Sequence, residues 1–101
     1  MATSKIISSE PKAVLVPNEL FTWDSGNLIF AVPIATIKSN TGLSDIVRFN
    51  IQGGDNSTGF LFGVGISGDG KRATICGYIP SSNQQISSND INRFKLYAIG
   101  Y

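Results

Sequence analysis

The chain has 101 residues, close to the commonest size of a single domain and long enough to bury one hydrophobic core. It is 42% hydrophobic but only 15% charged, and its aromatic and β-branched residues exclude a disordered chain. Eight basic and seven acidic residues give a net charge of +1 and, apart from Lys71-Arg72, the basic residues stand singly. Because nucleic-acid binding needs a concentrated basic face, we do not expect a nucleic-acid partner.

The residues that most enzymes rely on are scarce. Histidine is absent, which removes the commonest general base and metal ligand. Cys76 is the only cysteine, so an internal disulfide is excluded, and its apolar surroundings predict a small buried side chain. The acidic residues are not clustered in sequence, although folding could still bring two carboxylates together. We predict no catalytic, cofactor-binding or metal-binding residues, and a protein that is not an enzyme.

The chain begins with a polar segment. We expect residues 1–10 to form an N-terminal arm that becomes ordered on docking with a partner, and residues 11–101 to form a single β domain. The segment lacks the apolar core of a signal peptide. The longest apolar stretch, residues 28–37, is interrupted by Pro33 and is too short to cross a bilayer. We therefore expect synthesis in the cytoplasm and no membrane association.

The first half of the domain is expected to contain short strands separated by turns. Residues 14–16 form a short strand, bounded by prolines, that is suited to a sheet edge. Residues 20–23 and 28–32 flank an Asp-Ser-Gly-Asn turn, which predicts a hairpin. Pro33 marks an edge, a bulge or the break before residues 34–37, and residues 39–42 form a further turn.

The second half alternates more regularly. Residues 47–52 and 59–67 place apolar and polar or small residues on opposite faces, as half-buried strands do. A Gly-Asp-Gly turn then leads into an apolar run over residues 72–79, which predicts a second hairpin. Residues 80–92 are expected to be a long surface loop with no more than one helical turn, and residues 93–100 the last strand. The predicted fold is all-β, a small antiparallel sandwich or barrel of about seven to eight short strands.

Two overlapping glycine patterns imitate nucleotide-binding motifs. Residues 63–68 spell G-x-G-x-x-G, and residues 65–71 spell the first part of a phosphate-binding loop. Both motifs require a helix after the glycines, whereas this segment continues into a turn and another strand. We therefore assign these glycines to close packing and turn formation.

Aromatic residues supply the remaining functional candidates. Because aromatic rings bury a large area at low entropic cost, Trp23, Tyr78, Tyr97, Ile99 and Tyr101 form the candidate interaction surface. Trp23 is also suited to covering the core beside its hairpin, the interpretation that we favour. The last strand is apolar on both faces, and so are residues 28–32 and 73–78. A small domain can cover few strands on both sides, which indicates a homo-oligomer.

The composition also carries a resemblance. A short β domain rich in Gly, Ser, Asn and Thr and poor in charge, with segments such as residues 59–72 and 93–101, resembles bacteriophage tail-fibre tips and capsid-decoration proteins. The resemblance implies a non-enzymatic virion protein that self-associates through β-strands, with a trimer among the expected forms, and that contacts other virion proteins. Two alternatives stay open: a lectin-like module that binds a carbohydrate receptor through Trp23 and the tyrosines, and a small virus-encoded inhibitor of a host protein.

Overall fold

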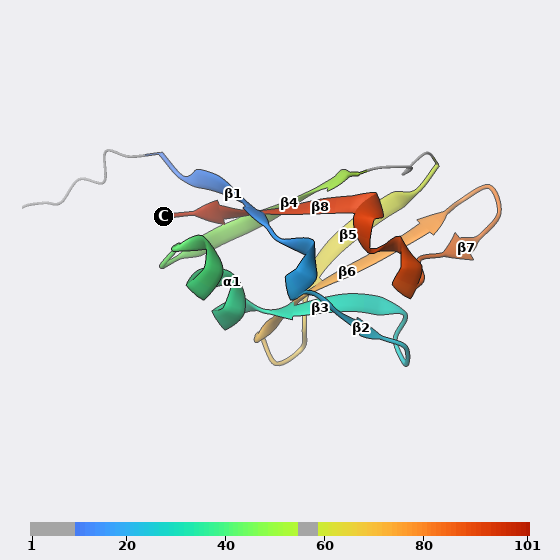
Figure 1. Cartoon of the computed structure of the whole chain (residues 1–101), viewed down its shortest axis with the longest axis horizontal. Coiled ribbons are helices and arrows are strands. Elements are labelled where there is room, and N and C mark those ends of the chain that lie inside the picture. Colours follow the sequence, from blue (N-terminus) through green and yellow to red (C-terminus); the bar gives the residue numbers. More distant parts are fainter. Residues whose placement is uncertain (1–9, 55–58) are drawn as a thin grey trace, which may run out of the picture.

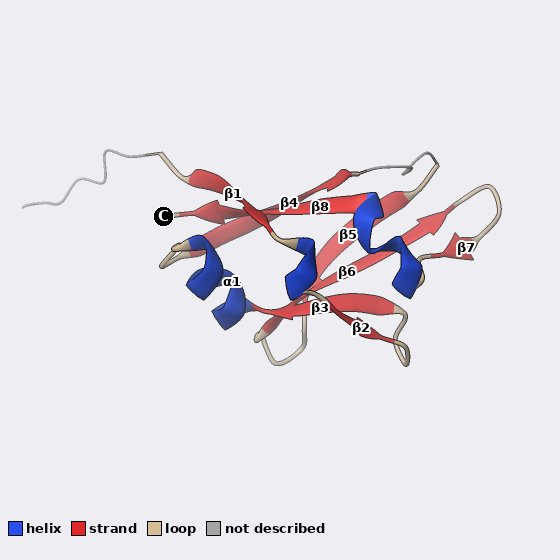
Figure 2. Ribbon diagram, in the orientation of Figure 1, coloured by secondary structure: helices blue, strands red, loops and turns tan. Residues whose placement is uncertain are grey.

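A computed structural model describes residues 10–54 and 59–101 of the chain. The expected arm therefore lies outside the described residues except for Glu10, which is exposed. The described part contains eight strands, one α-helix and two 3-10 segments (Figures 1 and 2). In chain order they are β1 (Lys12–Val16), η1 (Asn18–Leu20), β2 (Thr22–Asp24), β3 (Ile29–Pro33), α1 (Ile34–Thr41), β4 (Ile46–Gly53), β5 (Leu61–Ile66), β6 (Arg72–Ile79), β7 (Gln84–Gln85), η2 (Ser88–Arg93) and β8 (Phe94–Gly100).

The strands form two antiparallel sheets. One sheet has the order β1-β8-β4, and the other has the order β2-β3-β6-β5, with β7 paired to the end of β6. In Figure 1 the three-stranded sheet lies above β2 and β3, and α1 lies at the end where β8 finishes. The expected mostly-β fold is confirmed, and the strands of the described part do not close into a barrel.

The core lies between the two sheets and centres on Phe94, the first residue of β8. Its ring is fully buried, and its centroid lies 5.4 Å from that of Phe21, 5.5 Å from Phe30 and 5.8 Å from Phe62. These rings come from both sheets and from the segment before β2, so the aromatic cluster joins elements that are distant in sequence. Val32, Ile75, Leu96 and other aliphatic side chains complete the core.

Helix α1 replaces the extended segment and turn expected over residues 34–42. Pro33 precedes the first helical residue, and Gly42 ends the helix with a φ of 78°, a left-handed conformation that suits glycine. The amide of Gly42 donates a hydrogen bond to the carbonyl of Lys38 (2.9 Å). Ile37 is fully buried and anchors the helix on the core. The expectation of short strands and a turn over this segment was wrong, because Pro33 and Gly42 bracket two helical turns.

Residues 80–92 are more ordered than the surface loop that we expected. They contain β7 and two short 3-10 turns merged in η2, and the side chain of Ile86 is buried in the core. Ser87 and Asp90 form a capping box at the start of η2, and Arg93 pairs with Asp90. Burial acts to raise the pKa of Asp90, but hydrogen bonds from the Ser87 amide and hydroxyl and from Arg93 outweigh it, and the pKa is lowered.

Cys76 is exposed, which corrects the expectation of a buried thiol. In β6 the core-facing positions are Ala73, Ile75 and Gly77, so strand alternation places Cys76 on the outer face of the five-stranded sheet. The apolar run around Cys76 could not reveal this, because both faces of β6 carry apolar or small residues.

Candidate interaction surface

The five candidate residues do not form one surface. Trp23 faces the core: it is half-buried and pairs across the hairpin with Phe30, with ring centroids 4.8 Å apart and ring planes inclined by 60°. It therefore covers the core beside its hairpin, the interpretation that the sequence favoured. Its ring contributes to packing within the domain more than to an external contact.

Tyr78 lies on the outer face of the five-stranded sheet. It pairs across β5 and β6 with Leu61, and both side chains are exposed. Gly63 and Gly65 follow on the same face of β5, beside Cys76 and Thr74. This face therefore has one exposed apolar pair, Leu61 and Tyr78. Beside that pair lies a region of small side chains that project little from the sheet.

Tyr97 and Ile99 lie on the outer face of the three-stranded sheet, opposite the core-facing residues of β8. On one side Tyr97 pairs with Leu15 and Ile99 pairs with Ala13, both in β1. Strand alternation continues to Tyr101, which is exposed and exchanges backbone hydrogen bonds with Asp45. The structure thus brings Tyr97, Ile99 and Tyr101 onto one face, as the sequence indicated.

The other half of the same face is polar. In β4, Asn50 pairs with Tyr97 and Arg48 pairs with Ile99. On the outer face of the three-stranded sheet, Leu15, Tyr97 and Ile99 are therefore apolar. Lys95 at the other end of β8 and the β4 residues Arg48 and Asn50 are polar. Leu15 was not among the candidate residues, although its position in the doubly apolar run Val14-Leu15-Val16 is a signal that could have identified it.

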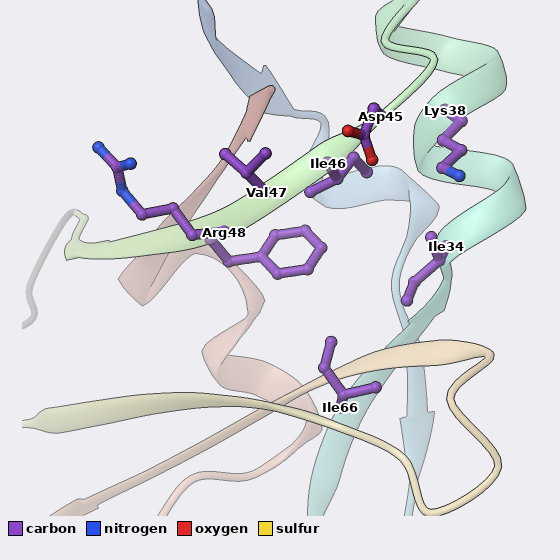
Figure 3. A pocket seen from close by; sticks show the side chains of 8 residues that line it. Ile34, Lys38, Asp45, Ile46, Val47, Arg48 and Ile66 are labelled. Carbon is purple, nitrogen blue, oxygen red and sulfur yellow. The ribbon is translucent and has the colours of Figure 1, made fainter. Parts of the chain in front are cut away.

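A pocket that no sequence pattern indicated lies between α1, β4 and β5, at the end where β4 begins and β5 finishes (Figure 3). Its volume is about 260 Å³. Figure 3 shows Ile34 and Ile66 reaching into the gap between α1 and β5, while the guanidinium of Arg48 points away from it. Five of the lining residues are apolar: Ile34, Ile46, Val47, Phe49 and Ile66. The other three are Lys38, Asp45 and Arg48.

The exposed carboxylates of Asp24 and Asp69 accept hydrogen bonds within turns. A hydrogen bond from the Asn27 side chain, together with those from the Asn27 and Gly26 amides, lowers the pKa of Asp24 in the β2–β3 turn. A hydrogen bond from the Ser67 hydroxyl, together with that from the Lys71 amide, lowers the pKa of Asp69 in the β5–β6 turn. Both side chains stabilise a tight turn by accepting local donors.

Neither of these carboxylates belongs to a metal-binding group. Within residues 10–54 and 59–101, no three of the Cys, Asp and Glu side chains gather in a way that could hold a metal ion. No helix in those ranges has the length and apolarity that crossing a membrane requires.

Comparison of the chain with models of protein families, with curated proteins and with solved structures finds no match in any of the three.

Proposed function

We propose that this chain is a non-enzymatic structural component of a bacteriophage particle that self-associates through its β-sheets. One observation carries the self-association: on the outer face of the three-stranded sheet Leu15 and Tyr101 are exposed and Tyr97 is half-buried, beside the buried Ile99. Such a contiguous face is typical of a contact with another protein. The virion role is supported by the composition and by residues 59–72 and 93–101, whose sequences resemble those of bacteriophage structural proteins.

The geometry of this face suits a contact between identical copies. The face has an apolar part around Leu15 and Tyr97 and a polar part formed by Arg48 and Asn50 of β4 and Lys95 of β8. Two copies that meet through their apolar halves bury Leu15 and Tyr97 and leave Arg48 in water. Burial of apolar area is worth about 25 cal/mol per Å². In this proposal the domain is an antiparallel sandwich with one outer face covered by its neighbour.

The carbohydrate-binding alternative has less support. Trp23 packs on Phe30, and Tyr78 lies on a different sheet from Tyr97 and Tyr101. A carbohydrate stacked on Tyr97 or Tyr101 therefore has neither Trp23 nor Tyr78 beside it, because both belong to the other sheet.

The mass of the protein in solution tests self-association. We expect light scattering at about 1–100 µM to show an oligomer, and Leu15→Lys to shift it toward monomer because the added charge must be desolvated. Leu28→Lys is the matched control: Leu28 is 44% exposed and Leu15 is 45% exposed, but Leu28 lies in the β2–β3 turn. A strict monomer over the whole range contradicts the proposal, and so does equal dissociation by the two variants.

The virion role needs a separate measurement. Mass spectrometry of purified virus particles from the source of the gene should detect the chain at a copy number comparable with other structural proteins. Its absence from the particles, with the chain abundant in infected cells, would overturn the virion role and leave the self-association standing.

A further inference from the structure

The pocket between α1, β4 and β5 exposes apolar side chains that the described part of the chain does not cover. Ile66 is 51% exposed and Val47 is 49% exposed, while Ile34, Ile46 and Phe49 are half-buried around them. The volume of about 260 Å³ exceeds that of a cavity of roughly 150 Å³ that holds a benzene-sized guest. The pocket can therefore accept branched aliphatic side chains.

Backbone groups that lack a strand partner border this pocket on the β5 side. The amide of Ser67 donates to the carbonyl of Arg72 (2.9 Å), which fixes the phase of the β5–β6 ladder. In an antiparallel ladder the bonded pairs alternate, so the N–H and C=O groups of Val64 and Ile66 point away from β6. Within the described residues no strand pairs with β5 on that side.

In the part of the chain that the structure describes, strand β4 also presents unpaired backbone groups next to the pocket. The amide of Gly54 donates to the carbonyl of Arg93 (2.7 Å), and the same alternation turns the backbone groups of Phe49 and Ile51 away from β8. The pocket thus combines apolar walls with outward-facing donors and acceptors. These are the features by which a sheet edge binds an extended peptide segment with an apolar anchor.

Of the sheet edges in the described residues, β5 is the one without a feature that discourages pairing. Its six residues contain no charge, no proline and no bulge. In contrast, β4 has a register shift before Arg48, and β1 lies between Pro11 and Pro17. Strand β2 has only three residues and β7 only two. Proteins usually protect edges by such means, so the β5 edge is suited to accepting another segment.

The nine residues before Glu10 are the occupant that fits. They are polar except for Met1, Ala2 and the adjacent pair Ile6-Ile7, and nine extended residues span about 30 Å. Lys12 pairs with Gly100, which pairs with Ile46 at the pocket, so this segment joins the domain at the pocket end of the three-stranded sheet. Pro11 favours extended backbone at Glu10, the residue that precedes it.

We propose that Ile6 and Ile7 of one copy occupy the β4–β5 pocket of a second copy, with residues 1–9 extended along the Val64–Ile66 end of β5. This inference rests on the self-association in the proposed function and identifies a second contact within it. The occupant is a segment of this chain, and the contact is separate from the outer face that carries Leu15.

The test compares three variants with the unaltered chain. The double variant Ile6→Ser/Ile7→Ser should dissociate, in light scattering, at a concentration about tenfold higher than the unaltered chain. Val47→Lys, which places a charge at the pocket, should have a similar effect. Leu61→Lys is the matched control, since Leu61 is 56% exposed but lies on the outer face of the other sheet.

A binding measurement isolates the contact. A fluorescein-labelled peptide of residues 1–10 should bind the Ile6→Ser/Ile7→Ser chain in fluorescence anisotropy, and Val47→Lys introduced into that chain should weaken binding by about tenfold or more. The same peptide with both isoleucines replaced by serine should not bind.

The outcomes separate the two proposals. If Leu15→Lys dissociates the assembly but the double variant does not, and the peptide does not bind, the pocket inference fails and the proposed self-association stands. If all forms are monomeric and the peptide does not bind, both fail. If the chain is monomeric and the peptide binds the double variant but not the unaltered chain, the segment docks within its own chain, and exchange between copies is wrong.

Discussion

Gly100, the last residue of β8, lies so close beneath the backbone carbonyl of Asp45 that no side chain fits between them. The next residue, Tyr101, donates its amide to the same carbonyl (2.9 Å). Here the register of β4 against β8 shifts between Ile46 and Arg48. This contact therefore fixes the start of β4, and with it the position of Val47 at the pocket.

Replacing Gly100 by alanine should destabilise the fold. The added methyl group meets backbone atoms of Asp45 and Ile46, which cannot rotate away, so we expect a loss of about 2–3 kcal/mol in the free energy of unfolding. Urea denaturation followed by tryptophan fluorescence measures it. Gly68→Ala is the control, because no atom lies within 4 Å of an added methyl group there. Equal stabilities for the two variants would show that the β4–β8 contact can relax.

Phe94 should be the most sensitive aromatic position. Its buried ring contacts Phe21, Phe30 and Phe62, so truncation to alanine removes packing on both sheets and should cost about 3–5 kcal/mol. If that variant does not fold, Phe94→Leu should still lose more stability than Phe60→Leu. Phe60 stacks on Phe62 but is only half-buried. A larger loss at Phe60 contradicts the central role of Phe94.

Asp90 should make the fold sensitive to acid. Its folded-state pKa lies below the unfolded value of 3.8, so the charged form favours folding above that pH, and the benefit is lost as the pH falls through the folded pKa. Asp90→Asn should cost about 1–2 kcal/mol at neutral pH, because the capping box and the Arg93 pair weaken. Urea titrations from pH 7 to pH 2 should show this difference shrinking below pH 3.8. A difference that is constant over the range contradicts the assignment.

Local patterns were enough to predict most of the strands. The apolar run over residues 72–79 matches β6, and the alternation over residues 59–67 contains β5, because side-chain period and glycine turns are properties of a few consecutive residues. The same locality explains the grouping of Tyr97, Ile99 and Tyr101, which needs only strand alternation.

Features that depend on distant partners were not predicted. The pocket combines Ile34, Phe49 and Ile66 from three separate elements, and no local pattern relates them. The face of a doubly apolar strand is also set by its partners: Cys76 turned outward because Ile75 pairs with Phe30 in the core. Helix α1 was missed because its apolar stripe is weak, although Pro33 and Gly42 bracket it.

Cys76 offers a probe for which sheet is covered in the assembly. It is exposed on the outer face of the five-stranded sheet, the opposite sheet from Leu15 and Tyr97. Because both proposed contacts leave that face in water, its reaction rate with a thiol reagent should be the same in the oligomer and in the Leu15→Lys monomer. Parallel labelling under denaturing conditions gives the intrinsic rate. Strong protection that appears only in the oligomer would place the shared interface on the five-stranded sheet, around Leu61 and Tyr78, and would contradict the assignment to β1 and β8.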